Sequence, residues 1–124
     1  MNSISIIITC HSKYIKFLPE AVKCVEKQNF KFSDKIIVCD NMDFTPSYDG
    51  WKVVHGNWGN PNPARNAGLN QARGEWVIFL DADDRLGDGY ISRLLDTPVE
   101  NNIACLYPDL HYFSNETNQI KHDL

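Results

Sequence analysis

Short apolar runs rich in β-branched residues recur along this chain, with polar, turn-rich segments between them. Such runs are typical of strands in a buried sheet. A predicted strand covers each of six segments: Ser3–Thr9, Asp34–Asp40, Trp51–His55, Trp76–Leu80, Ile103–Tyr107 and Leu110–Phe113.

Between these runs the apolar residues change to helical spacing. Leu18–Val25 carries a single apolar stripe, which predicts a helix with one face on the sheet. Pro63 is well placed as the first residue of a second helix, with Asn62 as its cap and Gly74 at its end. Tyr90–Leu95 predicts a third, brief helix. Alternating strands and helices predict an α/β fold: an open, mainly parallel, Rossmann-like sheet flanked by helices, as one domain over residues 1–124.

The strand over Trp76–Leu80 is apolar throughout, which indicates a strand covered on both faces, and it ends in a group of acids. Side-chain alternation predicts that Asp81 and Asp83 project to one side and share a ligand, while Asp84 points elsewhere. Hard oxygen ligands suit Mg²⁺ or Mn²⁺. The alternative is a solvated acidic turn that caps the following helix.

Polar residues also end two other predicted strands. Thr9 ends the first strand, Asp40 ends the second, and Asp81 follows the fourth. Ligands of open parallel sheets bind beyond the carboxyl ends of the strands. We therefore expect these three side chains to line one binding site.

Composition excludes several classes of protein. The hydrophobic share of 43% and the charged share of 23% are ordinary for a soluble domain. The net charge of −4, with scattered Lys and Arg, gives no reason to expect a nucleic-acid partner. Met1–Cys10 is too short for a membrane segment and begins without the basic residues of a signal peptide, so a cytoplasmic location is the default.

The cysteines at positions 10, 24, 39 and 105 are widely spaced, and we expect reduced, mostly buried thiols.

The residues of this chain resemble the nucleotide-binding half of the family 2 glycosyltransferases, which have the GT-A fold and use nucleotide-sugar donors. The resemblance runs from about Ser3 to Leu95. Its most specific parts are Ala64-Arg65-Asn66, Ala72-Arg73-Gly74 and Asp81-Ala82-Asp83-Asp84.

The resemblance implies a role for several residues. Thr9 and the pair Asp40 and Asn41 would line the pocket for the base and ribose of the donor. Arg65 would lie near the base and diphosphate, Asp81 near the ribose, and Asp83 would be the principal ligand of Mn²⁺ or Mg²⁺, with Asp81 beside it. The donor implied is a UDP-sugar, and the acceptor is unknown, with a glycan as one candidate.

The chain departs from the family pattern at five positions. Asn41 stands where a second Asp is usual, which keeps a carbonyl oxygen and loses a charge. His11 and Ser12 replace a common Tyr-Asn pair, and Met42-Asp43 replaces Gly-Ser.

Inverting transfer also needs a carboxylate base, which the family supplies well after the metal motif. The chain ends at Leu124, so we expect the acceptor half and its base to be missing. Asp109, His111 and His122 are nominal candidates, and we assign no catalytic base.

Three functions remain open at this point. The first is a glycosyltransferase of the hexosyltransferase type that inverts the sugar. The second is a truncated, non-catalytic nucleotide-binding or interaction module. The third, a magnesium-dependent phosphatase or nucleotidyltransferase, lacks a phosphate-cradling glycine loop after the first strand. A shortened sheet would expose apolar surface, which makes a homodimer plausible.

Overall fold

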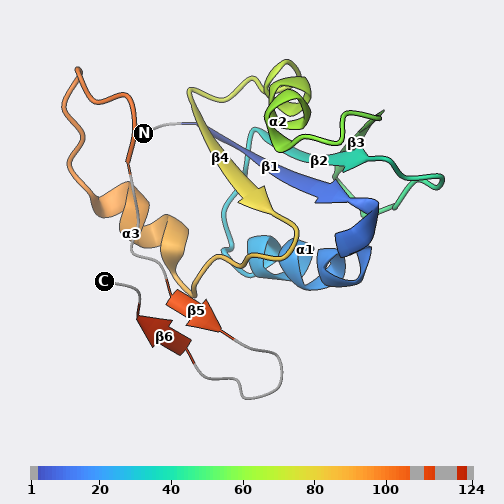
Figure 1. Cartoon of the computed structure of the whole chain (residues 1–124). Coiled ribbons are helices and arrows are strands. Elements are labelled where there is room, and N and C mark those ends of the chain that lie inside the picture. The colour runs from blue at the N-terminus through green and yellow to red at the C-terminus, as the bar shows by residue number, and fades with distance from the viewer. Residues whose placement is uncertain (1–2, 107–110, 114–119, 123–124) are drawn as a thin grey trace.

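The computed structural model describes residues 3–106, 111–113 and 120–122, the last two ranges as backbone only. Figure 1 shows a sheet with a helix against each face and a small hairpin to one side. The helical elements are the 3₁₀ helix η1 (Ser12–Phe17), α1 (Leu18–Glu26), α2 (Pro61–Leu69) and α3 (Tyr90–Asp96). The strands are β1 (Ile4–His11), β2 (Asp34–Asp40), β3 (Lys52–Gly56), β4 (Trp76–Asp81), β5 (His111–Phe113) and β6 (Ile120–His122).

The main sheet confirms the predicted open parallel α/β fold. Its strands lie in the order β3-β2-β1-β4, and each neighbouring pair is parallel. Strand β1 is central, with β2 on one side and β4 on the other. All the carboxyl ends therefore lie at one edge of the sheet.

Alternate residues of β1 face two separate hydrophobic cores. Ile6, Ile8 and Cys10 pack with the apolar stripe of α1 on one face. Ile7 packs on the other face, in a core that includes Ala64 of α2. Because a helix covers each face, β1 is apolar along nearly its whole length rather than alternating between apolar and polar residues.

The prediction for β4 was partly wrong, because β4 is an edge strand and its face toward α2 is covered only in part. Within the described residues no strand pairs with its outer side. Phe79 is 46% exposed, and Leu80 is the one residue of the strand that is buried. Helix α2 lies mainly over β1 and β2, so it leaves Phe79 of β4 exposed on its side of the sheet. An apolar run does not by itself distinguish a central strand from an edge strand.

Helix α2 also begins and ends earlier than predicted. It starts at Pro61, and the cap is Asn60, whose Oδ1 accepts a hydrogen bond from Asn62 N at 2.9 Å. It ends at Leu69, so Gly74 does not terminate it. A Cβ atom on Gly74 would lie 2.6 Å from the backbone nitrogen of Ser5. Glycine is needed there because the chain passes close to β1 before β4.

The predictions for the last third of the chain are partly wrong. Ile103 to Leu106 form no strand, and the amide of Ile103 instead closes a turn onto the carbonyl of Glu100 at 3.1 Å. Tyr107 and Leu110 lie outside the described residues. The strand expected near Phe113 is present as β5, and it pairs antiparallel with β6, which the sequence did not predict.

All four cysteines are free thiols, as expected, but they differ in burial. Cys10 and Cys39 are buried, Cys24 is half-buried, and Cys105 is exposed. Burial raises the pKa of the Cys39 thiol to about 11. Burial, with Cys39 and Asp83 nearby, raises the pKa of Cys10 to about 12. These two thiols are protonated at neutral pH and behave as small apolar side chains of the core.

Gly68 is where α2 approaches the sheet most closely, and we predict that Gly68→Ala destabilises the protein. An added Cβ would lie 2.6 Å from Cγ2 of Ile7 and 2.9 Å from Cγ2 of Val38. The overpacking should cost about 1–3 kcal/mol and outweigh the gain of up to about 1 kcal/mol in helix propensity. Urea denaturation measures the difference. The matched control is Asn66→Ala on the exposed face of α2, which should be neutral or slightly stabilising. Equal stabilisation by both substitutions would show that α2 does not pack this closely.

Candidate functional site

The parallel register brings the predicted polar strand ends together. Thr9 of β1 lies opposite Asp81 of β4, and His11 of β1 lies opposite Asp40 of β2. These positions all lie at the carboxyl edge of the sheet. The expected convergence of Thr9, Asp40 and Asp81 is therefore present in the backbone.

Asp81 is the centre of a polar contact between three elements. Its Oδ1 accepts a hydrogen bond from Oγ1 of Thr9 at 3.0 Å and from Nη2 of Arg65 at 3.1 Å. The Arg65 guanidinium also approaches Oδ2 at 3.4 Å, so one nitrogen spans both carboxylate oxygens. Helix α2 carries Arg65 to this position because it packs across the face of the sheet. Three residues predicted for the site are thus in direct contact.

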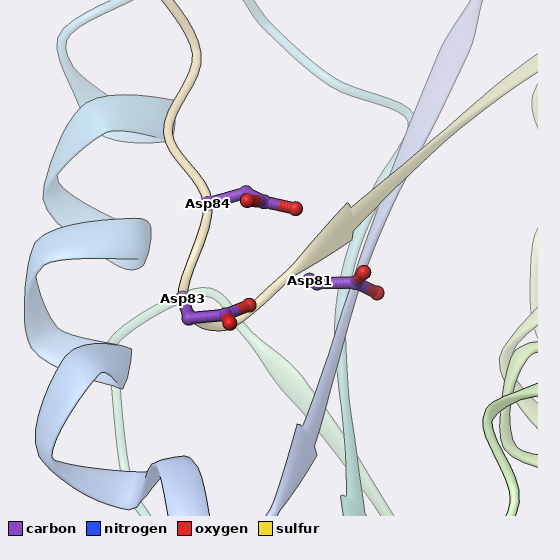
Figure 2. Close-up of side chains that lie close together, drawn as sticks. All are labelled: Asp81, Asp83 and Asp84. Carbon is purple, nitrogen blue, oxygen red and sulfur yellow. The ribbon is translucent and has the colours of Figure 1, made fainter. Parts of the chain in front are cut away.

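The chain turns immediately after Asp81, and this turn corrects the prediction for Asp84. The amide of Ala82 donates to the carbonyl of Thr9 at 3.0 Å, and the amide of Asp84 donates to the carbonyl of Asp81 at 2.9 Å. Strand alternation no longer applies beyond the turn. As a result Asp81, Asp83 and Asp84 each offer a carboxylate oxygen within 4.8 Å of the other two (Figure 2). We call these three residues the acid cluster.

The acid cluster has the chemistry of a site for a divalent cation. Burial, and then the charges of Asp83 and Asp81, raise the pKa of Asp84 above its ordinary value. Arg65 compensates the charge of Asp81, whereas Asp83 and Asp84 are exposed. Oxygen ligands at this spacing fit Mg²⁺ or Mn²⁺, and the exposed pair leaves room for a ligand that completes the metal shell. None of the three acids caps the next helix, because the residue at the N-cap of α3 is Gly89.

Asp40 has a structural contact that sequence reasoning missed. Its Oδ1 accepts hydrogen bonds from the amides of Trp58 at 2.7 Å and Gly59 at 3.2 Å. Asp40 therefore anchors the loop that leads into α2 and Arg65. The signal available in the sequence was the stretch of Gly, Asn and Pro residues around Gly59, which adopts a positive φ of 61° in the structure. Asn41 follows with a φ of 59°, is exposed, and its amide donates to the carbonyl of Gly56 at 2.9 Å.

The nominal candidates for a base have no described side chain at this site. Asp109 lies outside the described residues. His111 and His122 lie on β5 and β6, of which the backbone alone is described. No residue is assigned as the base.

The fold and the site define the class of protein. It is an open parallel α/β domain in which a threonine, an arginine and an acid cluster meet at the carboxyl edge of the sheet. The family model described as glycosyl transferase family 2 matches residues 5–124. The chain therefore belongs to glycosyl transferase family 2.

Similar proteins agree with this assignment. The GalNAc(5)-diNAcBac-PP-undecaprenol beta-1,3-glucosyltransferase of Campylobacter jejuni is 34% identical in an alignment that covers 81% of this chain and 36% of that protein. The poly(ribitol-phosphate) beta-N-acetylglucosaminyltransferase TarP of Staphylococcus aureus is 29% identical over 82% of this chain and 35% of its own length. The chain spans about a third of the length of these relatives.

A solved structure shows the same fold. The crystal structure of Staphylococcus aureus TarS 1–349 in complex with UDP-GlcNAc matches with a TM-score of 0.66 and 25% identity, over 76% of this chain and 30% of that one. Within the residues that the structure describes, no helix is long and apolar enough to cross a membrane.

The acid cluster predicts a pH-dependent effect of Asp84→Asn in the absence of metal. A carboxyl group whose pKa is raised by folding stabilises the fold while it is protonated, and this contribution is lost as the pH rises above the ordinary value of 3.8 and through the raised one. At pH 7 the ionised Asp84 therefore opposes folding. Asp84→Asn should increase the free energy of unfolding at pH 7, by less than about 1 kcal/mol because the group is exposed.

Urea denaturation at pH 7 and pH 3.5, in a chelating buffer, measures this effect. The gain should shrink at the lower pH. The control is Asp88→Asn, an exposed aspartate outside the acid cluster, which should give no such gain. A loss of stability in Asp84→Asn at pH 7 would contradict the described charge repulsion.

Proposed function

We propose that this domain binds a nucleoside-diphosphate sugar, most simply a UDP-sugar, through a divalent cation held by the acid cluster. The observation that carries the proposal is the group of three carboxylates at and just after the end of β4, next to Arg65. The similarity to TarS, whose crystal structure is a complex with UDP-GlcNAc, supports UDP as the nucleotide.

In this proposal each element of the edge has a part in donor binding. Asp83 is the principal metal ligand, with Asp81 beside it. Thr9, Asp40 and Asn41 line the pocket for the base and ribose. Arg65 lies within reach of the base and diphosphate while it compensates Asp81. Asp84 joins the cluster as a third carboxylate, which sequence reasoning did not include.

The chemistry proposed is transfer of the sugar with inversion. A bound Mn²⁺ or Mg²⁺ would stabilise the negative charge that develops on the departing diphosphate. Arg65 adds a fixed positive charge at the same edge. The acceptor hydroxyl must lose a proton to a base, and no described residue is assigned that role. The names of the Campylobacter and TarP relatives, both sugar transferases, support this reaction class.

Donor binding can be measured by isothermal titration of UDP with and without Mn²⁺. In the wild type, Mn²⁺ should tighten the binding of UDP. Asp83→Ala should remove that gain in affinity. Loss of an outer-shell partner weakens metal binding about 10–100-fold, and loss of a direct ligand should weaken it at least as much. The control Asp88→Ala removes an exposed aspartate from the same segment and should bind like the wild type. Absence of any Mn²⁺ effect in the wild type would refute the proposal.

Turnover is tested separately from binding. A non-catalytic nucleotide-binding module is the alternative, since the chain spans about a third of its relatives' length and has no assigned base. Both possibilities predict Mn²⁺-dependent binding of UDP. Release of UDP from a UDP-sugar, with or without an added glycan acceptor, would show that the domain is catalytic.

A further inference from the structure

Gln28, just after α1, uses both ends of its side-chain amide. The residue is 8% exposed. Its Nε2 donates to the carbonyl of Cys24 at 3.2 Å and to the carbonyl of Gly87 at 3.0 Å. Its Oε1 accepts a hydrogen bond from the amide of Ile91 at 3.0 Å. A buried amide with all these partners joins the end of α1 to a segment about 60 residues further along the chain.

The segment that Gln28 holds comes directly after the acid cluster. Gly87 and Ile91 span the turn into α3, and Ile91 is 1% exposed. Nearer the acids, the amide of Leu86 donates to Sγ of Cys24 at 3.3 Å. In Figure 2, Asp83 and Asp84 lie on the stretch of chain that passes α1. The end of α1 therefore fixes the chain from two residues after Asp84 onward.

The other end of the same stretch is fixed by the sheet. The amide of Ala82 donates to the carbonyl of Thr9, as a continuation of the pairing between β1 and β4. Asp83 and Asp84 thus lie between two anchors, one on β1 and one on α1. Their side chains are exposed and carry like charges, so contacts within the cluster do not hold them together.

We propose that Gln28 is a positioning residue for Asp83 and Asp84, and that it sets the affinity of the acid cluster for the metal-bound diphosphate of the donor. This inference rests on the proposed function. Mg²⁺ and Mn²⁺ demand a near-fixed arrangement of oxygen ligands, and a segment free at one end would have to be ordered when the metal binds. Gln28 holds the segment in place beforehand.

Glutamine suits this task because one planar group supplies a donor and an acceptor. Leucine has a similar volume and offers neither. It would leave the buried amide of Ile91 without this partner, which is costly in a protein interior. It would also remove the hydrogen bond that ties the side chain to the carbonyl of Gly87. Asparagine has the same group on a stem one methylene shorter and cannot reach both partners from the same backbone position.

The test measures UDP binding, with and without Mn²⁺, on Gln28→Leu and Gln28→Asn. Both variants should weaken Mn²⁺-dependent binding by about tenfold or more, the range for outer-shell partners of a metal, and should change Mn²⁺-independent binding little. The matched control is Gln71→Leu, an exposed glutamine after α2, which should bind as the wild type does. Gln28→Asn carries the test if Gln28→Leu does not fold.

A double-mutant cycle separates positioning from a general loss of stability. Once Asp83→Ala has removed the metal ligand, Gln28→Asn should weaken UDP binding no further. Full Mn²⁺-dependent affinity in a folded Gln28 variant, even one with a lower melting temperature, would overturn the inference. So would an equal loss of binding with and without Mn²⁺. If the wild type itself shows no Mn²⁺ effect, the proposed function has failed, and this result is distinct from a variant that behaves as the wild type does.

Discussion

The parallel pairing of β1 with β2 on one side and β4 on the other is the constraint on which the rest of the structure depends. This pairing places Thr9 opposite Asp81 and His11 opposite Asp40. Side chains more than 70 residues apart meet because their strands end at the same edge. The two cores that bury β1 hold this register, since a slip by one residue would exchange its two faces.

The acids at that edge differ in whether the protein supplies them with hydrogen-bond partners. Arg65 and Thr9 occupy the carboxylate of Asp81, and backbone amides of the loop before α2 occupy one oxygen of Asp40. Asp83 and Asp84 lie beyond the sheet, exposed and close to each other. The carboxylates of Asp81 and Asp40, which join elements of the fold, therefore have hydrogen-bond partners within the protein. The part that faces solvent carries two neighbouring carboxylates, which suit a cation and the phosphates that accompany it.

Residues with strong local signals were predicted well. The apolar run Asp34–Asp40 formed a strand with the expected bounds, because a run this short, rich in β-branched residues and bounded by polar residues favours a strand over a helix. The Asp-Ala-Asp-Asp sequence predicted that Asp81 and Asp83 lie close together, which the structure confirms, and their role in holding a metal stays a prediction. The start of α2 was placed at Pro63 instead of Pro61, because each of these prolines follows an asparagine that can cap a helix.

The remaining errors come from information that a local pattern does not hold. Alternation placed Asp84 away from the cluster, and it failed because a hydrogen bond from the Asp84 amide turns the chain at Asp81. The anchoring contacts of Asp40 and Gln28 join segments distant in sequence, and neither residue type predicts which distant segment it will contact. The edge position of β4 depends on what lies beside it, which its own residues do not encode.

The most direct test of the central claim is a crystal structure of the domain grown with UDP and Mn²⁺. We predict the metal between Asp83 and the diphosphate, at the carboxyl edge formed by β1, β2 and β4, with Arg65 still beside Asp81. Nucleotide bound at any other part of the sheet, or at this edge with no metal against Asp83, would contradict the claim.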